Sequence, residues 1–366
     1  MIKFNYQKLP LNIKNLYDEQ LANQLASTHG SISAINQMSR LLHNPTLLMR
    51  PILAKEAEAS SQLEGTQASV EDAYQLDITD QSEEKRNEAL EIRNYEEAML
   101  TGIEVLGKTK HGISELLIRE THKRLMRGVR GKKKNPGEYR NDEVWIGKLG
   151  TNKSQAKYLP PEATQIKPLM EELVQFVNNR GGIHPLIACG IMHHRLEAIH
   201  PFKDGNGRVG RLLISLYLID QGLLEYPILY PSGFFETHKK QYTNSLSIVD
   251  QKQDWYQWFI FFLKALEKQA QASHNIALKI DSLFRNARAK IEKERAHINL
   301  VRVLEFTFTR PFITSALLET ELNIPRTTCD RYLEKLSKHK IIEFVGIHKR
   351  SNVYANRKLL RLLRSI

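Results

Sequence analysis

The sequence has few cysteines, since only Cys189 and Cys329 occur in 366 residues and they lie far apart. The pair shows neither the clustered pattern of a disulfide framework nor the spacing of metal ligands. Such sparse use of cysteine is typical of proteins from a reducing compartment. We therefore expect a cytoplasmic protein in which neither thiol has a catalytic role.

Long apolar segments are also missing. No stretch approaches the ~20 apolar residues that span a bilayer, and the N-terminus MIKFNYQKLPLN lacks the apolar core of a signal peptide. Internal repeats and low-complexity tracts are absent as well. The hydrophobic content of 41% and the charged content of 26% are ordinary for globular proteins. These features predict a soluble protein of two or three folding units that does not contact a membrane.

Acidic residues are scarce at the C-terminal end of the sequence. Residues 331–366 contain ten Lys or Arg residues against two Glu residues, a net charge of +8 within a chain whose formal net charge is +12. The basic excess suits a polyanionic partner, and it belongs mainly to this end of the chain.

Helical periodicity dominates the remainder. Apolar residues recur at steps of three and four from Asn36 to Leu106, with a break at Asp77–Ser82. Further helices are predicted at Ser114–Met126, around Ile166–Val177, from Pro185 to Ala198, at Leu212–Leu218, and from Asp254 through a long connecting stretch to Glu294. Two short extended pieces, EVWIG and AKYLPPEA, flank a turn and predict a β-hairpin. The fold class is therefore mainly α.

The last 70 residues read as helix, turn, helix and then two short strands joined by a basic turn. This order resembles a winged helix-turn-helix. Its basic residues fall along the second helix and in the wing, where contacts to DNA phosphates are expected: Arg326, Arg331, Lys335, Lys338, Lys349 and Arg350. Such units also bind other proteins, so the sequence is compatible with either DNA or a protein as the partner of this unit.

The resulting domain organisation has four parts. We expect an N-terminal helical region at 1–107, a catalytic core at 108–267, a connecting helix at 268–295 and a winged-helix domain at 296–366.

The stretch HPFKDGNGRVGR, His200 to Arg211, carries the strongest chemical signal. Gly205 and Gly207 flank Asn206 and allow a tight turn that leads into an apolar helix. The backbone N–H groups of such a turn, together with the helix N-terminus, form an anion site. The two arginines of the stretch, Arg208 and Arg211, are three residues apart on one helical face and suit different oxygens of a polyphosphate.

Two further residues complete this arrangement. The carboxylate of Asp204 suits Mg²⁺, which usually takes one or two carboxylates and leaves its other positions to phosphate and water. His200 is placed to take a proton from an incoming hydroxyl near neutral pH. Each residue alone has an ordinary structural explanation, such as a turn, a helix cap or a solvated arginine. Together they indicate nucleotidyl transfer.

HPFKDGNGRVGR also resembles, without departure, the signature HPFx[DE]GNGRxxR of the Fic (filamentation induced by cAMP) family. The resemblance covers 114–266, including PGEYR and VWIG. It implies a helical Fic fold and transfer of AMP from ATP, with Mg²⁺, to a Ser, Thr or Tyr hydroxyl of a target protein. The general base is then His200, the metal ligand Asp204, and the nucleotide-binding residues Gly205, Asn206, Gly207, Arg208 and Arg211. The hairpin near 145–158 looks like the flap that aligns the target segment by strand addition.

The stretch SSQLEGT fits a second Fic motif, [ST]xxxE[GN], which some family members carry on an inhibitory helix. Ser60, Glu64 and Gly65 are its defining residues, and we call the segment from Ser60 to Gly65 the inhibitory motif. The resemblance implies that Glu64 forms an ion pair with Arg211 and so keeps this arginine from the γ-phosphate.

Several alternatives remain open at this point. In some relatives the same glutamate also supports removal of AMP, and other members of the fold transfer phosphate or phosphocholine. A homodimer is a further alternative, as is a DNA-binding regulator. His193, His194 and His200 suggest zinc, but adjacent histidines on a helix face different ways, and no further ligand follows at short range.

Overall fold

The computed structural model describes residues 1–365 apart from 42–43, 109–111, 129–133, 148–151 and 293–296. The chain is mainly helical with small sheets, as the sequence predicts. The longer α-helices are α1 (Glu19–Leu41), α2 (Thr46–Leu63), α4 (Glu83–Lys108), α5 (Glu115–Leu125), α6 (Ala163–Asn178), α7 (Pro185–Ile199), α8 (Asn206–Asp220), α10 (Lys239–Lys252), α11 (Trp255–Glu292), α12 (Ile298–Thr309) and α14 (Arg326–Lys338). The shorter ones are α3 (Val70–Gln75), α9 (Ser232–Thr237), α13 (Ser315–Leu322) and α15 (Arg357–Arg364).

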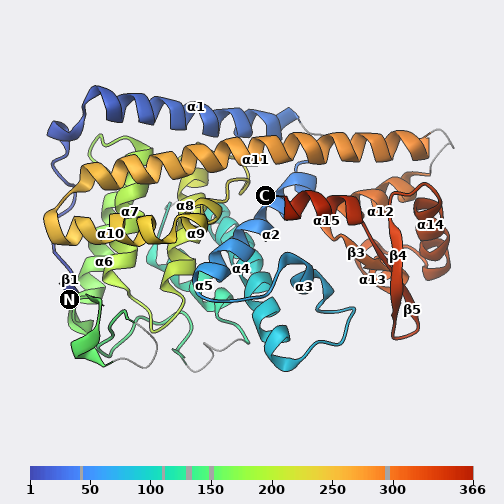
Figure 1. The fold of residues 1–366 in the computed structure, drawn as a ribbon, viewed down its shortest axis with the longest axis horizontal. Coiled ribbons are helices and arrows are strands. Elements are labelled where there is room, and N and C mark those ends of the chain that lie inside the picture. The colour runs from blue at the N-terminus through green and yellow to red at the C-terminus, as the bar shows by residue number, and fades with distance from the viewer. Residues whose placement is uncertain (42–43, 109–111, 129–133, 148–151, 293–296, 366) are drawn as a thin grey trace.

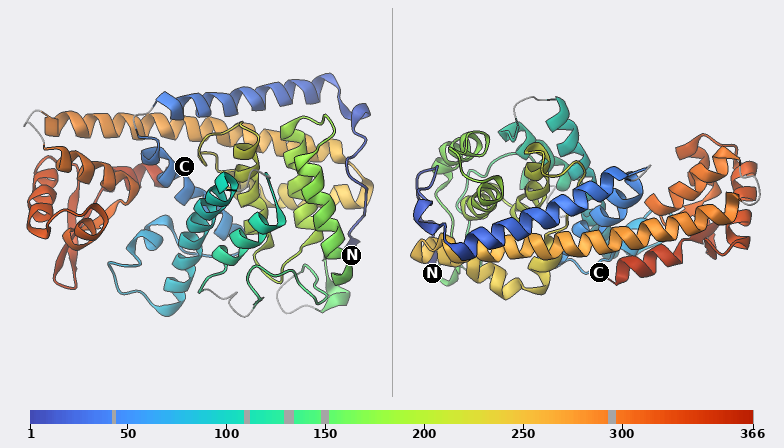
Figure 2. Two further views of the ribbon diagram at one scale, coloured as in Figure 1. Left: turned by 180° about the vertical axis from the view of Figure 1, so that it is seen from behind. Right: turned by 90° about the horizontal axis from the view of Figure 1, so that it is seen from above.

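Two long helices, α1 and α11, lie side by side along one side of the molecule (Figures 1 and 2). α11 contacts α1 and α7 along one part of its length and α12 and α15 along another, and its aromatic residues Trp255, Trp258, Phe259 and Phe262 are buried as core packing. A single apolar cluster extends from α1 through the central helices into α12 and α14. None of the described helices combines the length and apolar character that crossing a membrane requires.

α7 and α8 are the central helices, and nearly every side of each is buried, as their continuous apolar sequences predict. α7 begins where sequence chemistry favours a helix start. Pro185 occupies the first turn, and Nδ1 of His184 accepts a hydrogen bond from the Leu186 N–H at 3.2 Å. The two helices pack against each other, so the loop between them is held at both ends.

The N-terminal helical region differs in detail from the prediction. The stretch predicted to be helical from Asn36 to the break at Asp77 contains the end of α1, all of α2 and the short α3. α2 ends because Gly65 follows it with a φ of +100°, and α3 begins because Ser69 and Asp72 form a capping box. The inhibitory motif therefore lies at the C-terminus of α2.

The predicted β-hairpin is present in reduced form, and its central residues 148–151 lie outside the described part. Ile146 and Tyr158 form an antiparallel bridge, and β2 (Tyr158–Leu159) continues from it. On its other edge β2 pairs in parallel with β1 (Ile2–Lys3). The sequence did not predict β1 because a two-residue strand has no detectable periodicity.

The C-terminal unit has the predicted winged-helix architecture. α12, α13 and α14 pack beside a three-stranded sheet in the order β3 (Phe312–Thr314), β5 (Ser351–Ala355), β4 (Glu343–His348). Lys349 and Arg350 form the turn between β4 and β5, and both have positive φ. α15 follows and packs on α11.

Candidate active site

His200 lies at the end of α7 in the left-handed conformation, with φ 52° and ψ 59°. Its Nδ1 is 3.3 Å from the carbonyl oxygen of Glu197. Because a carbonyl oxygen only accepts, Nδ1 carries the hydrogen and Nε2 keeps a free lone pair. Burial lowers the pKa of His200 to about 4, so the imidazole is neutral at pH 7. Nε2 of His200 can therefore accept a proton at neutral pH.

The loop between α7 and α8 is fixed by the side chain of Asn206. Its Oδ1 accepts from the Phe202 N–H and its Nδ2 donates to the Phe202 carbonyl, both at 2.8 Å. Phe202 is fully buried and stacks on His122, with 3.7 Å between ring centroids. Nε2 of His122 lies 3.0 Å from the carbonyl oxygen of Asp204, to which it donates. The side-chain amide of Asn206 thus fixes the shape of the loop.

Gly205 and Gly207 are required here by geometry. Gly205 caps α8 with a φ of +76°, and a Cβ on it would lie 2.8 Å from the Sδ of Met126. A Cβ on Gly207 would lie 2.2 Å from Oε1 of Glu64 and 2.8 Å from Nη1 of Arg211. The first turn of α8 therefore approaches the end of α2 closely.

Arg211 is buried and donates three hydrogen bonds to the inhibitory motif. Its Nε donates to Ser60 Oγ at 2.9 Å, and its Nη2 donates to the Ser60 carbonyl at 2.9 Å and to Glu64 Oε1 at 2.7 Å. Burial opposes the charge on Glu64, but the guanidinium of Arg211 outweighs it and lowers the pKa of this carboxyl below its usual value. The ion pair implied by the family resemblance is therefore present.

Arg208 and Asp204 lie on another side of the loop. Arg208 is buried with its Nη1 3.4 Å from Glu91 Oε2 and its Nη2 3.8 Å from Asp204 Oδ1. Its partners thus differ from those of Arg211, although the two arginines belong to the same helix. The side chain of Asp204 is 43% exposed and accepts from the Gly205 N–H at 2.6 Å. One accessible carboxylate fits a Mg²⁺ ion whose other ligands come from phosphate and water.

A cavity of about 840 Å³ brings four of the predicted site residues together, and Asp204 and Arg208 are not among its lining residues. His200, Gly207, Arg211 and Glu64 line one side of it. The other side is formed by flap residues and by the start of the chain: Met1, Ile2, Ile146, Gly147, Ala156, Lys157 and Tyr158. Its volume lies within the ~300–1,000 Å³ typical of ligand pockets. The base, the helix N-terminus and the backbone of the flap therefore share one space.

Two family models match the chain, Fic/DOC family over residues 112–218 and Fic/DOC family N-terminal over residues 22–104. The chain belongs to the Fic/DOC family. The first match contains the His200–Arg211 signature, and the second contains the inhibitory motif.

Several curated relatives share the Fic segment. A probable protein adenylyltransferase of Aquifex aeolicus is 35% identical over 112 residues, which cover 31% of this chain and 32% of that protein. A protein adenylyltransferase Fic of Drosophila mojavensis is 28% identical over 117 residues, which cover 31% of this chain and 20% of that protein. The chain thus matches about a third or less of the length of these relatives.

Solved structures share the fold over a larger part of the chain. A Fic family protein from Desulfovibrio desulfuricans has a TM-score of 0.58 at 21% identity, covering 96% of this chain and 98% of that one. A Fic-1 fragment from C. elegans has a TM-score of 0.52 at 20% identity, covering 72% of this chain and 73% of that one. The similarity to the Desulfovibrio desulfuricans structure covers both the part of the chain that contains His200 and the C-terminal unit.

The residues that hold α2 in place were not predicted from the sequence. Glu56, one turn before Ser60, is buried and accepts from the Tyr95 hydroxyl at 2.8 Å and from the Ser232 N–H at 3.0 Å. Burial raises the pKa of Glu56 to about 7. At the other end of the segment, Lys239 Nζ donates to the carbonyl of Leu63 at 2.6 Å. These contacts join positions far apart in the sequence, so no local pattern marks them.

Arg140, from the PGEYR segment, is a second missed residue. It is buried, and its Nε donates to the His200 carbonyl at 2.8 Å. Its other nitrogens donate to the carbonyls of Asp142 at 2.8 Å, Pro161 at 2.6 Å and Ile199 at 3.4 Å. One side chain thus fixes the end of α7 to the segments on either side of the flap.

We expect Arg140→Ala to lower the free energy of unfolding by about 3 kcal/mol, because several buried carbonyls lose a charged donor. Arg119 is the matched control, since it is exposed and donates to a single carbonyl, that of Gly137. Arg119→Ala should cost about 1 kcal/mol or less. Urea unfolding followed by circular dichroism measures both. Equal stability of the Arg140 variant and wild type would contradict this assignment.

His193 and His194 have packing and hydrogen-bonding partners of their own. The Nε2 of His193 lies 2.7 Å from the Tyr242 hydroxyl, and the Nε2 of His194 lies 3.2 Å from the Leu246 carbonyl oxygen. Both are buried, and burial lowers the pKa of each to about 3. They support the walls of the cavity as neutral residues.

Proposed function

We propose that this chain is a protein adenylyltransferase that transfers AMP from ATP to a Ser, Thr or Tyr hydroxyl of a target protein, and that Glu64 inhibits it. The observation that carries the proposal is the placement of a neutral His200 and of Arg211 on one ligand-sized cavity beside the N-terminus of α8. The printed names of the curated relatives support the same reaction.

The transfer needs one base and one anion site. The target hydroxyl oxygen attacks the α-phosphorus of ATP, and its proton passes to Nε2 of His200. The bond between the α-phosphorus and the oxygen bridging to the β-phosphate breaks, and pyrophosphate leaves with the electron pair. Because the left-handed turn at His200 and the carbonyl of Glu197 fix the imidazole, Nε2 is oriented before the substrate arrives.

The phosphates are held by the start of α8. The backbone N–H groups of its first turn have no acceptor within the helix and carry partial positive charge. Asn206 keeps the turn in shape through Phe202. Asp204 would hold Mg²⁺, which neutralises phosphate charge when it is bound with ATP. Arg211 would complete the site at the outer phosphates once its donors are free.

Glu64 competes with ATP for Arg211. Carboxylate and phosphate are both anions that seek the same fork of N–H donors. Because Oε1 of Glu64 already accepts from Nη2 at 2.7 Å, an outer phosphate can bind Arg211 only after the carboxylate moves. The side chain of Glu64 is 41% exposed and lies on the cavity, so this movement requires no unfolding of the core.

Two labels on ATP distinguish AMP transfer from transfer of a terminal phosphate. The purified Glu64→Gly variant is incubated with Mg²⁺ and cell extract, using ATP labelled either on the α-phosphate or on the γ-phosphate. We expect protein-bound label from the α-phosphate alone. Label from the γ-phosphate instead would replace the proposal with phosphoryl transfer.

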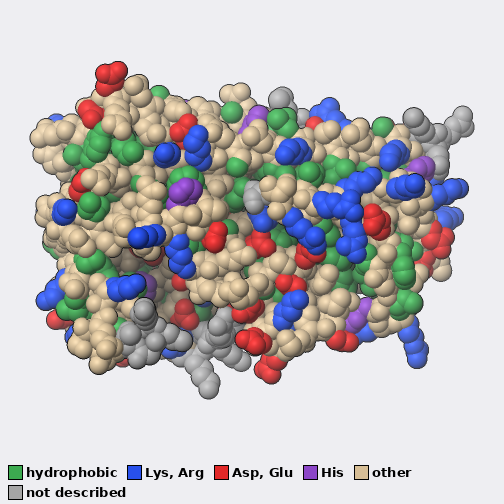
Figure 3. Space-filling view, viewed as in Figure 1, with side chains coloured by type: hydrophobic (Ala, Val, Ile, Leu, Met, Phe, Trp, Pro, Cys, Tyr) green, Lys and Arg blue, Asp and Glu red, His purple; other side chains and the backbone are tan. Residues whose placement is uncertain are grey.

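A second activity, duplex DNA binding, is favoured by the C-terminal unit. Arg331 and Lys338 are exposed on α14, and Lys349 and Arg350 form the wing. Figure 3 shows Lys and Arg side chains gathered over this end of the molecule. A basic helix beside a basic wing is the arrangement with which winged-helix proteins contact phosphates. We propose it as an addition to catalysis.

We expect the full chain to bind duplex DNA with an affinity that falls steeply with salt, since each phosphate contact releases a counterion. Arg331→Ala combined with Lys338→Ala should weaken binding by about tenfold or more and reduce the salt slope. Lys167→Ala, on the exposed face of α6, is the matched control. Fluorescence anisotropy at several salt concentrations measures both. No binding at low salt would remove this activity.

A further inference from the structure

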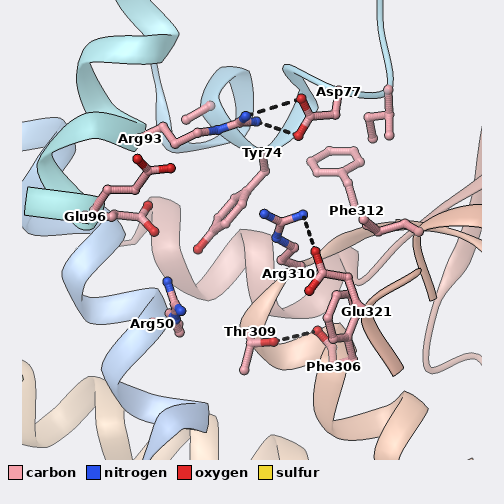
Figure 4. Close-up of a pocket in the computed structure, with 14 residues that line it drawn as sticks. Arg50, Tyr74, Asp77, Arg93, Glu96, Phe306, Thr309, Arg310, Phe312 and Glu321 are labelled. Atoms are coloured by element: carbon pink, nitrogen blue, oxygen red, sulfur yellow. Dashed lines mark hydrogen bonds and ion pairs between the residues drawn. The ribbon is translucent and has the colours of Figure 1, made fainter. Parts of the chain in front are cut away.

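A second cavity, of about 230 Å³, lies between the N-terminal helices and the winged-helix unit (Figure 4). Its walls come from α2, α3 and α4 on one side and from α12, β3 and α13 on the other. Among the residues described, it shares no lining residue with the cavity of about 840 Å³ that His200 lines, which we call the catalytic cavity. The proposed reaction therefore gives it no role.

Three arginines point into this cavity, and they differ in how well they are satisfied. Arg93 is paired with Asp77 through two bonds of 2.7 and 3.2 Å. Arg310 lies 3.8 Å from Glu321, which is beyond hydrogen-bond distance. Arg50, half-buried on α2, has no hydrogen bond or ion pair within the described part of the chain. Arg50 thus offers unused donors to the cavity, and Arg310 offers the donors that its long ion pair with Glu321 does not use.

The hydroxyl of Tyr74 is a further group without a partner. Its oxygen is buried and makes no hydrogen bond to any residue that the structure describes. The groups that act on it electrostatically are Glu96, Arg50 and Arg310, which Figure 4 shows around the same space. Buried polar groups are nearly always hydrogen-bonded, so an orphaned hydroxyl between two arginines points to a ligand.

Glu96 is the one carboxyl of the cavity wall without a bonded partner in the described ranges. Burial raises its pKa to about 7, against the opposing charges of Arg50 from α2 and of Arg310, which directly follows α12. Arg93 and Glu97 of its own helix and Tyr74 of α3 also face it. Near neutral pH the group is therefore partly protonated, and in that form it donates a hydrogen bond and does not repel an anion.

We propose that this cavity binds a small oxyanion, the carboxylate or phosphate group of a metabolite-sized molecule, through Arg50, Arg310 and the Tyr74 hydroxyl. Two guanidinium groups and one hydroxyl match the several acceptor oxygens of such a group. The volume is below the ~300 Å³ at which pockets for drug-sized ligands begin, so the occupant is small. The cavity connects α2, which carries the inhibitory motif, to the winged-helix unit.

The proposal predicts how binding depends on pH. An anion binds most tightly while Glu96 is protonated, so affinity should be highest below pH 7 and should fall as the pH rises through the pKa of this carboxyl. Glu96→Gln is permanently neutral and keeps the donor. At every pH this variant should therefore bind the anion as tightly as the wild-type chain does below pH 7, and its affinity should no longer depend on the ionisation of residue 96.

Isothermal titration calorimetry of the full chain tests this with two probes, succinate for the carboxylate source and inorganic phosphate for the phosphate source. The titrations are made at about pH 6 and about pH 8, on either side of the pKa of Glu96. We expect saturable binding of at least one probe, tighter at the lower pH. Arg50→Gln should weaken it by at least about tenfold, the cost of one charge-assisted contact.

Three further variants keep the test decisive. Tyr74→Phe keeps the ring and removes only the orphaned hydroxyl, so it should fold normally and bind more weakly. Arg40→Gln removes an exposed arginine that pairs with Glu225, and it should bind like wild type. Arg211→Gln removes an anion donor of the catalytic cavity and should also leave this binding intact.

If neither succinate nor phosphate bound saturably at the lower pH, the proposal would be overturned. Binding that is lost in Arg211→Gln and retained in Arg50→Gln would also overturn it, since this would place the anion in the catalytic cavity. The readout does not involve AMP transfer, so failure of the proposed reaction would leave this result interpretable.

Discussion

Glu64→Gly should raise the rate of AMP transfer by at least about tenfold, equivalent to ~1.4 kcal/mol in the apparent barrier. In the proposed mechanism, the carboxylate of Glu64, which accepts from Nη2 of Arg211, competes with an outer phosphate for this donor. Removing the carboxylate leaves the bonds from Arg211 to Ser60 in place and frees the Nη2 hydrogen that Glu64 accepts. The substitution is therefore expected to increase both the productive binding of ATP and the turnover rate.

The rate is measured as α-label incorporated per minute into protein of a cell extract, with wild type and variant at equal concentration. Gln62→Gly is the matched control, because it introduces the same flexible residue near the end of α2 and leaves the carboxylate in place. The Gln62→Gly variant should not raise the rate of AMP transfer to a comparable degree. If both variants were equally active, the effect would come from loosening of the helix and not from loss of the ion pair.

His200→Ala, introduced into the Glu64→Gly chain, should lower the rate of AMP transfer by about 10²–10⁴-fold, the usual contribution of a general base. Because burial lowers the pKa of His200 to about 4, the base is already unprotonated at pH 6 to 8. The value of kcat/KM should therefore be flat across that range and should decline only as the pH falls toward about 4.

Initial rates across this pH range, at ATP concentrations well below KM, report the ionisation of the free enzyme. His122 is a matched control, since His122→Ala removes a buried imidazole that supports the same loop without lining the catalytic cavity. It should retain a measurable rate. A rate that rises from pH 6 to 8 with a midpoint near the ordinary histidine pKa would show that His200 is not the desolvated base described here.

The sequence alone predicted much of the catalytic loop because its chemistry is local. Gly205, Asn206 and Gly207 lie side by side in the chain, and their turn leads directly into an apolar helix. The central helices were also predictable, since apolar residues on all sides indicate burial. The winged-helix unit followed from the spacing of its helices and strands.

Other features depend on contacts between distant segments and left no local signal. Glu56 anchors the inhibitory helix to Ser232, and Arg140 holds the carbonyl of His200. Neither position differs from an ordinary charged residue in the sequence. The ion pair between Glu64 and Arg211 was expected only through a family resemblance, because no periodicity links positions that far apart. The different partners of Arg208 and Arg211 likewise depend on what packs beside each face of α8.

The most direct test of the account compares wild type, Glu64→Gly and Glu64→Gly/His200→Ala, each incubated with Mg²⁺, α-labelled ATP and a cell extract as the source of target. Labelled protein is quantified, and intact-mass analysis of the purified chain reports self-modification. The account predicts strong labelling by Glu64→Gly, weak labelling by wild type and none by the double variant. Equal labelling by all three, or no added AMP in any of them, would contradict it.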